Sequence, residues 1–202
     1  LMTGSEGLLG VITEVTVKIL KAPEVVKAAL VGFPTIEDAG NCVAEIIAQG
    51  CIPAGMEIMD KALTKATNDY AKAGYPTDAE AMMIVEFDGT EHEVEDYIGK
   101  VKQIAEKNNS SSLKVSKSNE ERLKFWAGRK AAFPACGVLA PDYMCMDGSI
   151  PRGKLAEVLN EISRLSKKYD LPVANAFHAG DGNLHPLIMF DANNPDSLRK
   201  CE

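Results

Sequence analysis

The chain has 202 residues, of which 46% are hydrophobic, and a formal net charge of −7 at pH 7. A chain of this length and composition can bury a core, so we expect a soluble globular protein of one domain or slightly more. The lysines and arginines are scattered singly, which argues against binding to nucleic acid or to a membrane surface.

The sequence also indicates a cytoplasmic protein. No apolar run approaches the roughly 20 residues that span a bilayer, and no signal segment opens the chain. The five cysteines are dispersed and include no C-x-x-C pair, so we expect neither a disulfide framework nor a thiolate zinc site. We predict reduced, mostly buried cysteines and no transmembrane segment.

Both ends of the sequence look interrupted. The chain opens on "LMTGSEGLLG" and stops at "DSLRKCE", where a helix that Asp196 or Ser197 could cap is beginning. We therefore expect this chain to be a piece of a longer polypeptide.

Strand and helix periodicities alternate along the first part of the chain. In order, they predict strands at 11–20 and 25–33, a helix at 36–49 with Thr35 as its N-cap, a strand at 52–59, and a helix begun by Asp60. The stretch "AMMIVEFDGTEHEVEDYIGKVKQIAEKN" repeats the cycle of strand, turn and capped helix, with Thr90 and Glu93 as the capping residues. A short strand at 112–115 follows. Two successive β-α-β units predict an α+β fold of the ferredoxin-like kind, with a largely antiparallel sheet and helices on one face.

A third helix begins at a predicted capping box. Ser118 can accept from the amide of Glu121, whose carboxylate can reach back to the amide of Ser118. The helix should continue to about Pro134.

Arg129 shares one face of this helix with three aromatic residues, which are Phe125, Trp126 and Phe133. A guanidinium on an apolar stripe needs an anion or an aromatic partner. Arg129 could stack on Trp126 or extend to water. Alternatively, it could bind a carboxylate with its planar fork.

The stretch "PDYMCMDGSIPRGKL" predicts a strand that leads into a helix with Pro151 in its first turn. Asp147 is interpreted as a turn or cap residue rather than a catalyst. The expected buried stripe of the helix consists of Leu155, Val158, Leu159, Ile162, Leu165 and Tyr169.

The stretch "FHAGDGNLHP" places two of the three histidines around a glycine-rich turn. His178 should share a strand face with Ala174 and Ala176, and His185 should share one with Leu187 and Met189. Gly180 and Gly182 permit unusual backbone angles, so the turn could bring both imidazoles to one metal, with Asp181 orienting an imidazole. The alternative is an ordinary hairpin with incidental histidines. His92 is expected to be merely solvated.

Several blocks together resemble one family. "HAGDGNLHPLI" resembles the H-x-G-D-G-N-x-H signature in the C-terminal domain of FAD-linked oxidases of the vanillyl-alcohol oxidase type, and "WAGRKAAFPA", "PDYMCMDGSIPR" and "GMEIMD" resemble neighbouring blocks. Within that family, these blocks resemble the glycolate oxidase and D-lactate dehydrogenase group. The opening "GSEGLLGVITEVTVKI" resembles the last strand of the FAD-binding domain. The resemblance implies that 1–20 is a remnant of the FAD-binding domain, and that 21–202 is a substrate (cap) domain truncated at its C-terminal end.

The resemblance also implies site residues. His178 and His185 match the family's ligands for a divalent metal such as zinc, manganese or iron, and Arg129 matches the arginine that pairs with the substrate carboxylate. Cys145 stands where D-2-hydroxyglutarate dehydrogenases have a lysine, which favours a shorter substrate such as glycolate or lactate. The FAD-contacting residues fall on Gly4, Ser5, Glu6, Gly7, Gly10 and Ile12.

The implied parent is a flavin-dependent 2-hydroxy acid oxidase or dehydrogenase that passes hydride from the substrate α-carbon to FAD. It could work with other oxidase subunits or an electron-transfer partner. Most of the FAD domain and a later S-x-E-H-G block, with a glutamate ligand and a further histidine, are not in this chain, so no catalytic base is assigned. We expect the fragment alone to lack FAD and to be inactive. The alternative is a non-catalytic ligand-binding or interaction module that uses the same α+β fold.

Overall fold

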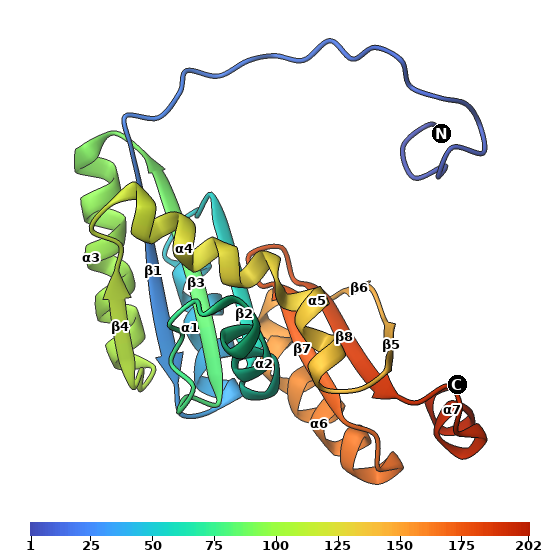
Figure 1. Ribbon diagram of the computed structural model, residues 1–202. Helices are drawn as coiled ribbons and strands as arrows, with labels where there is room; N and C mark the ends of the chain where they lie inside the picture. Colours follow the sequence, from blue (N-terminus) through green and yellow to red (C-terminus); the bar gives the residue numbers. More distant parts are fainter.

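The computed structural model describes all residues, 1–202, and contains one open, entirely antiparallel sheet with helices around it (Figure 1). The strands are β1 (Val25–Phe33), β2 (Gly55–Asp60), β3 (Ala81–Gly89), β4 (Ser112–Val115), β5 (Asp142–Cys145), β6 (Gly148–Ser149), β7 (Val173–His178) and β8 (Asn183–Phe190). The helices are α1 (Ile36–Ala48), α2 (Lys61–Ala71), α3 (Glu91–Lys107), α4 (Asn119–Lys130), α5 (Ala132–Ala135), α6 (Leu155–Tyr169) and α7 (Pro195–Cys201), with short 3₁₀ turns η1 (Cys136–Val138) and η2 (Arg152–Lys154).

The sheet order confirms the predicted α+β fold. The strands run β4-β1-β3-β2-β7-β8-β5, with β6 beside β8. The first four follow a ferredoxin-like arrangement, in which β3 lies between β1 and β2, with α2 inserted between β2 and β3. The hairpin β7–β8 extends this sheet from β2, so the C-terminal histidine stretch lies beside the N-terminal β-α-β units.

The helices cover both faces of the sheet, rather than the single face expected. One apolar cluster joins α1, α3 and α6 to the sheet, and a second joins α2, α4 and α5 to the opposite face. The reason lies in the central strands: residues 81–85 of β3 are all buried, so both faces are apolar and both must be covered.

Most of the predicted helix starts are confirmed. Thr35, Asp60, Thr90 and Ser118 each accept a hydrogen bond from the amide three residues on. The reciprocal half of the capping box predicted at Ser118 is wrong, because the Glu121 carboxylate accepts from the amide of Lys117, at 2.8 Å, and not from that of Ser118.

The third helix also ends earlier than predicted. α4 stops at Lys130, and Pro134 lies in the separate helix α5. Proline has no amide to donate to the carbonyl four residues before it and its ring collides with that carbonyl, so a continuous helix through this point is disfavoured.

The predicted strand at 11–20 is wrong. Residues 1–24 precede the first strand and run away from the sheet, with only turns in their opening part (Figure 1). A strand needs a neighbour for its backbone hydrogen bonds. Both sides of β1 are already taken, by β3 and β4.

The stripe of α6 is only partly buried. Leu155 and Leu159 are buried, whereas Leu165 and Tyr169 are 36% and 45% exposed and line a cavity of about 500 Å³ next to β8 and α7. None of the helices combines the length and apolar composition that crossing a bilayer requires.

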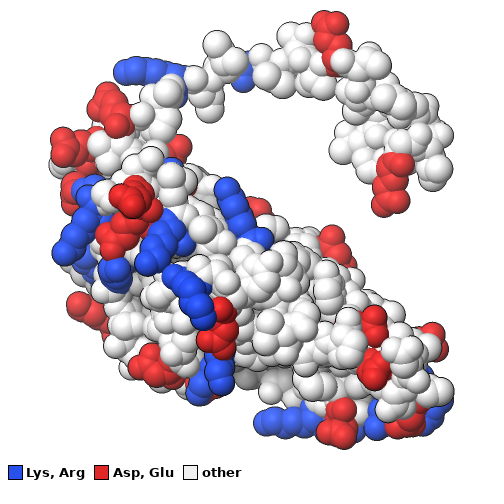
Figure 2. Space-filling model, viewed as in Figure 1, with Lys and Arg blue, Asp and Glu red and all other residues white.

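The cysteines match the sequence-based expectation, and the charged side chains are mixed in sign on one face. The face shown in Figure 2 carries acidic and basic side chains intermixed, with no continuous basic stripe. All five cysteines are free thiols, and only Cys145 is exposed.

Candidate functional site

Two neighbouring strand pairs bring the two histidines together. His178 lies opposite Glu57 of β2, and His185 lies opposite Ala176. The expected face is confirmed, because Ala174, Ala176, Leu187 and Met189 all belong to the apolar cluster beneath α4 and α5. The histidines are therefore diagonal neighbours on the hairpin.

Gly182 fixes the turn between these strands. Its φ is +72°, and an added Cβ would overlap the carbonyl oxygen of Ile150. The amide of Ile150 donates to the carbonyl of Gly182 at 2.9 Å, which ties the turn to the segment before α6. Gly180 does not have a positive φ, so only one of the two glycines is required for its backbone conformation.

The two imidazole rings lie edge to face. Their centroids are 5.1 Å apart with an interplanar angle of 89°. The side chain of His178 is 47% exposed and that of His185 is 16% exposed. This arrangement leaves one ring open to a ligand and the other partly enclosed.

A carboxylate lies beside each ring, and neither is Asp181. His178 Nδ1 is 2.8 Å from Glu57 Oε1, and His185 Nδ1 is 3.7 Å from Asp147 Oδ1. Asp147 also accepts from the side-chain amide of Asn183, at 2.8 Å. The residue expected to orient an imidazole, Asp181, makes no side-chain hydrogen bond to either histidine. It lines the nearby cavity instead.

Arg129 pairs with an internal anion. Its Nε and Nη2 atoms each lie 3.0 Å from Glu57 Oε2, and both residues are 8% exposed. Arg129 therefore neither stacks on Trp126 nor extends to water. The indole of Trp126 donates instead to Glu86, at 2.5 Å. Nη1 of Arg129 makes no hydrogen bond within the chain and stays available to another acceptor.

Glu57 is the residue that the sequence reasoning missed. It is a buried carboxylate in a strand whose neighbours are Met56 and Ile58. A charged residue inside an apolar strand is costly to bury unless it is paired. That pattern, inside the block "GMEIMD", was the signal that could have identified it.

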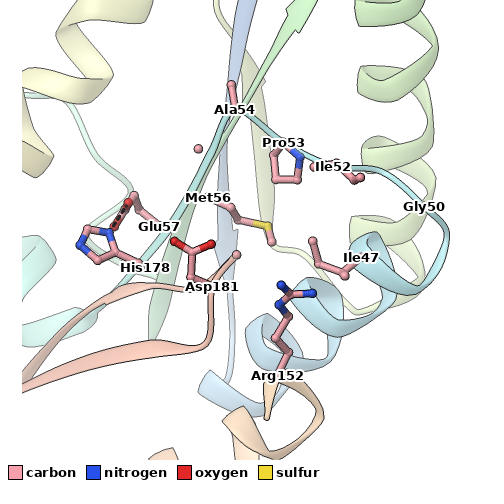
Figure 3. A pocket seen from close by; sticks show the side chains of 12 residues that line it. Ile47, Gly50, Ile52, Pro53, Ala54, Met56, Glu57, Arg152, His178 and Asp181 are labelled. Carbon is pink, nitrogen blue, oxygen red and sulfur yellow. Dashed lines mark hydrogen bonds and ion pairs between the residues drawn. The ribbon is translucent and has the colours of Figure 1, made fainter. Parts of the chain in front are cut away.

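A cavity of about 410 Å³ adjoins this cluster (Figure 3). In that view Glu57, His178 and Asp181 lie on one side of it, and Ile47, Ile52 and Arg152 lie on the other. Arg152 forms no hydrogen bond or ion pair through its side chain. The cavity is large enough for a small organic acid and lies next to the exposed ring of His178.

The donor set fits two positions of a metal site. Imidazole nitrogens are common ligands of zinc, manganese and iron, and a carboxylate on Nδ1 leaves Nε2 as the coordinating atom. Within residues 1–202, no group of three or more His, Cys, Asp or Glu side chains is arranged to enclose a metal. His178 and His185 could thus contribute two ligands and not a complete set.

The residues expected to contact FAD lie apart from the histidines. Gly4, Glu6 and Gly7 have positive φ values of 78°, 50° and 83°, which makes a tight exposed turn in the segment that leaves the sheet. Gly10 and Ile12 follow in the same exposed segment. A glycine-rich turn allows close backbone approach to a cofactor, but this segment alone encloses none.

The family of FAD linked oxidases, C-terminal domain, matches residues 22–202, and this chain belongs to that family. The chain is 52% identical over 202 residues to the glycolate oxidase subunit GlcD of Escherichia coli (strain K12), across 100% of this chain and 40% of that protein. It is 36% identical over 207 residues to the mitochondrial D-lactate dehydrogenase [cytochrome] of Arabidopsis thaliana, across 100% of this chain and 36% of that protein. It therefore spans well under half the length of these relatives.

Solved structures show the same fold at low identity. An alkyldihydroxyacetonephosphate synthase matches with a TM-score of 0.68 and 17% identity, over 98% of this chain and 42% of that chain. The 4-ethylphenol oxidase from Gulosibacter chungangensis matches with a TM-score of 0.64 and 10% identity, over 90% of this chain and 42% of that chain. These matches show that the chain shares its fold with these two proteins.

Proposed function

We propose that this chain is the substrate (cap) domain of a flavin-dependent oxidoreductase that acts on a small 2-hydroxy acid of the glycolate or D-lactate type. The names of the relatives, glycolate oxidase and D-lactate dehydrogenase, support this reaction class. The observation that carries the proposal is the pair of His178 and His185, which lie edge to face at 5.1 Å, with His178 lining a cavity.

His178 and His185 would hold a divalent metal such as zinc, manganese or iron. Glu57 occupies Nδ1 of His178, so Nε2 is the ligand atom that this residue offers. When bound, a divalent metal supplies a Lewis acid that lowers the pKa of the substrate hydroxyl.

Arg129 would orient the substrate carboxylate. Glu57 accepts the hydrogen bond from Nε and forms an ion pair with Nη2, whereas Nη1 has no hydrogen bond within the chain. Because Glu57 holds the guanidinium in place, little side-chain freedom would be lost when a substrate binds. Cys145, opposite Leu187 in the sheet, places an uncharged side chain on the histidine face, which supports a substrate without a second carboxylate.

The N-terminal segment would contact the flavin. FAD, when bound, would supply the acceptor for the hydride of the substrate α-carbon. The family match begins at residue 22, and residues 1–24 form no strand or helix, which supports a division between a remnant of the FAD domain at 1–20 and the cap domain at 21–202. The cytoplasmic location and the partner subunits stay predictions from the sequence.

Replacement of the histidines in the full-length protein tests this function. We expect His178→Ala and His185→Ala each to reduce bound divalent metal and 2-hydroxy acid turnover by more than the roughly 10- to 100-fold typical of changes beside a metal ligand. His92→Ala is the matched control, because His92 lies exposed in the first turn of α3. Metal content and turnover that match wild type in both site variants would contradict the proposal.

A further inference from the structure

We propose that Glu57 is a positioning residue that couples Arg129 to His178 and fixes which nitrogen of His178 faces the ligand. This inference rests on the proposed function, since it assigns a role within the same site. Three elements meet at this carboxylate: β2 carries it, α4 carries Arg129, and β7 carries His178. Glu57 and His178 are 121 residues apart in sequence and directly opposite in the sheet.

The use of the two carboxylate oxygens distinguishes this contact from a simple ion pair. An arginine fork usually takes both oxygens of a carboxylate in parallel. Here Nε and Nη2 of Arg129 both approach Oε2, and Oε1 is left to His178. Glu57 therefore bridges a cation and an imidazole, with one oxygen for each.

Burial makes the bridge rigid. The side chains of Glu57 and Arg129 are 11% and 10% exposed, so neither can turn to water without losing its partner. An unpaired buried charge is strongly unfavourable. Arg129 thus holds Glu57 in the orientation that His178 requires.

The consequence is a fixed tautomer. A carboxylate accepts but does not donate, so the neutral ring of His178 carries its proton on Nδ1 and donates it to Oε1. The lone pair is then on Nε2, which is the nitrogen free of protein contacts. Without Glu57, the ring would be free to rotate and to exchange tautomers, and it would bind a metal less well.

The chain provides a matched control in Glu86. This carboxylate lies on the adjacent strand β3 and is also bridged to α4, by Nη1 of Arg122 at 2.9 Å and by the indole of Trp126. It touches no histidine. Glu86→Gln removes the negative charge from a comparable bridge between α4 and the sheet without altering the environment of His178.

The test uses the metal-free full-length protein with ¹⁵N-labelled histidine, at about pH 8, well above the ordinary histidine pKa of about 6.5. In wild type and Glu86→Gln, the ¹⁵N shifts of His178 should report one tautomer with the proton on Nδ1. In Glu57→Gln they should report a mixture. Manganese or zinc affinity, measured by titration, should fall by about 10- to 100-fold in Glu57→Gln only.

A double variant guards against misfolding. Glu57→Gln leaves Arg129 buried without a charge partner, whereas Glu57→Gln with Arg129→Gln removes both charges and should fold. In this double variant, His178 should again lose its fixed tautomer. If His178 keeps one tautomer and wild-type metal affinity in this folded variant, the positioning role is wrong. If the wild-type protein shows the fixed tautomer but oxidises no 2-hydroxy acid, the positioning role stands and the proposed function fails.

Discussion

Asp60 is a buried carboxylate whose protonation is linked to folding. It caps α2 through the amide of Leu63, at 2.9 Å, and accepts from the side-chain amide of Asn175 at 2.8 Å. Burial nevertheless raises its pKa from 3.8 to about 6, because desolvation outweighs these hydrogen bonds. The stabilisation associated with protonated Asp60 is full below about pH 4 and is lost as the pH rises through about 6.

Asp60→Asn should remove this pH dependence. Asparagine still caps the helix, and the raised pKa corresponds to about 2–3 kcal/mol at 1.36 kcal/mol per unit. Relative to wild type, the free energy of unfolding of the variant should therefore increase between about pH 4 and pH 7. Urea unfolding across this range measures the difference. A difference that does not change with pH would show that Asp60 is not the linked group.

The sequence identified some residues of the site and not others. His178 and His185 flank one turn, so strand alternation alone predicts that they share a face. The partner of Arg129 could not be predicted in this way, because Glu57 lies on another strand. Pairing between β2 and β7 depends on the whole sheet and leaves no local pattern.

At the scale of elements, α4 is held against the sheet by close packing at Gly128. An added Cβ there would overlap the hydroxyl of Tyr75 and lie 2.6 Å from Cβ of Ala73. The hydroxyl of Tyr75 donates to the carbonyl of Phe125, which joins the same helix to the loop after α2. α4 carries Arg129, so this packing also sets the position of the guanidinium.

Gly128→Ala should lower the free energy of unfolding by about 1–3 kcal/mol, because overpacking outweighs the gain in helix propensity. Gly99→Ala in α3 is the control, since a Cβ added at Gly99 would have no neighbouring atom within 4 Å. That variant should be stabilised by up to about 1 kcal/mol. Chemical denaturation of both variants provides the comparison, and equal stability of the two would refute the packing role of Gly128.

Local signals predicted the helix starts and several strands. Long-range contacts decided whether the segment 11–20 forms a strand and which faces of the sheet are covered. Thr35, Thr90 and Ser118 act on amides three residues away, so the sequence reveals them. The segment 11–20 has strand alternation, but it forms no strand here because no neighbouring strand pairs with it. The covering of the second face of the sheet likewise depends on the long-range packing of α2, α4 and α5 against it.

At the scale of the whole molecule, one continuous sheet joins the β-α-β units to the histidine hairpin. The join between β2 and β7 places Glu57 beside His178, and α4 brings Arg129 over the same junction. The cavity opens at this junction (Figure 3), while the glycine-rich N-terminal turn lies away from it (Figure 1). The proposed site is thus formed where two parts of the fold meet, as is common for ligand sites.

The proposed function is tested most directly by anaerobic reduction of the flavin in the full-length protein. Glycolate and D-lactate are added separately to the oxidised protein, and the visible flavin absorbance is followed. We predict that at least one of these acids bleaches the flavin, and that His178→Ala slows the bleaching. A protein that binds no flavin, or a bound flavin that no 2-hydroxy acid reduces, would contradict the proposed function.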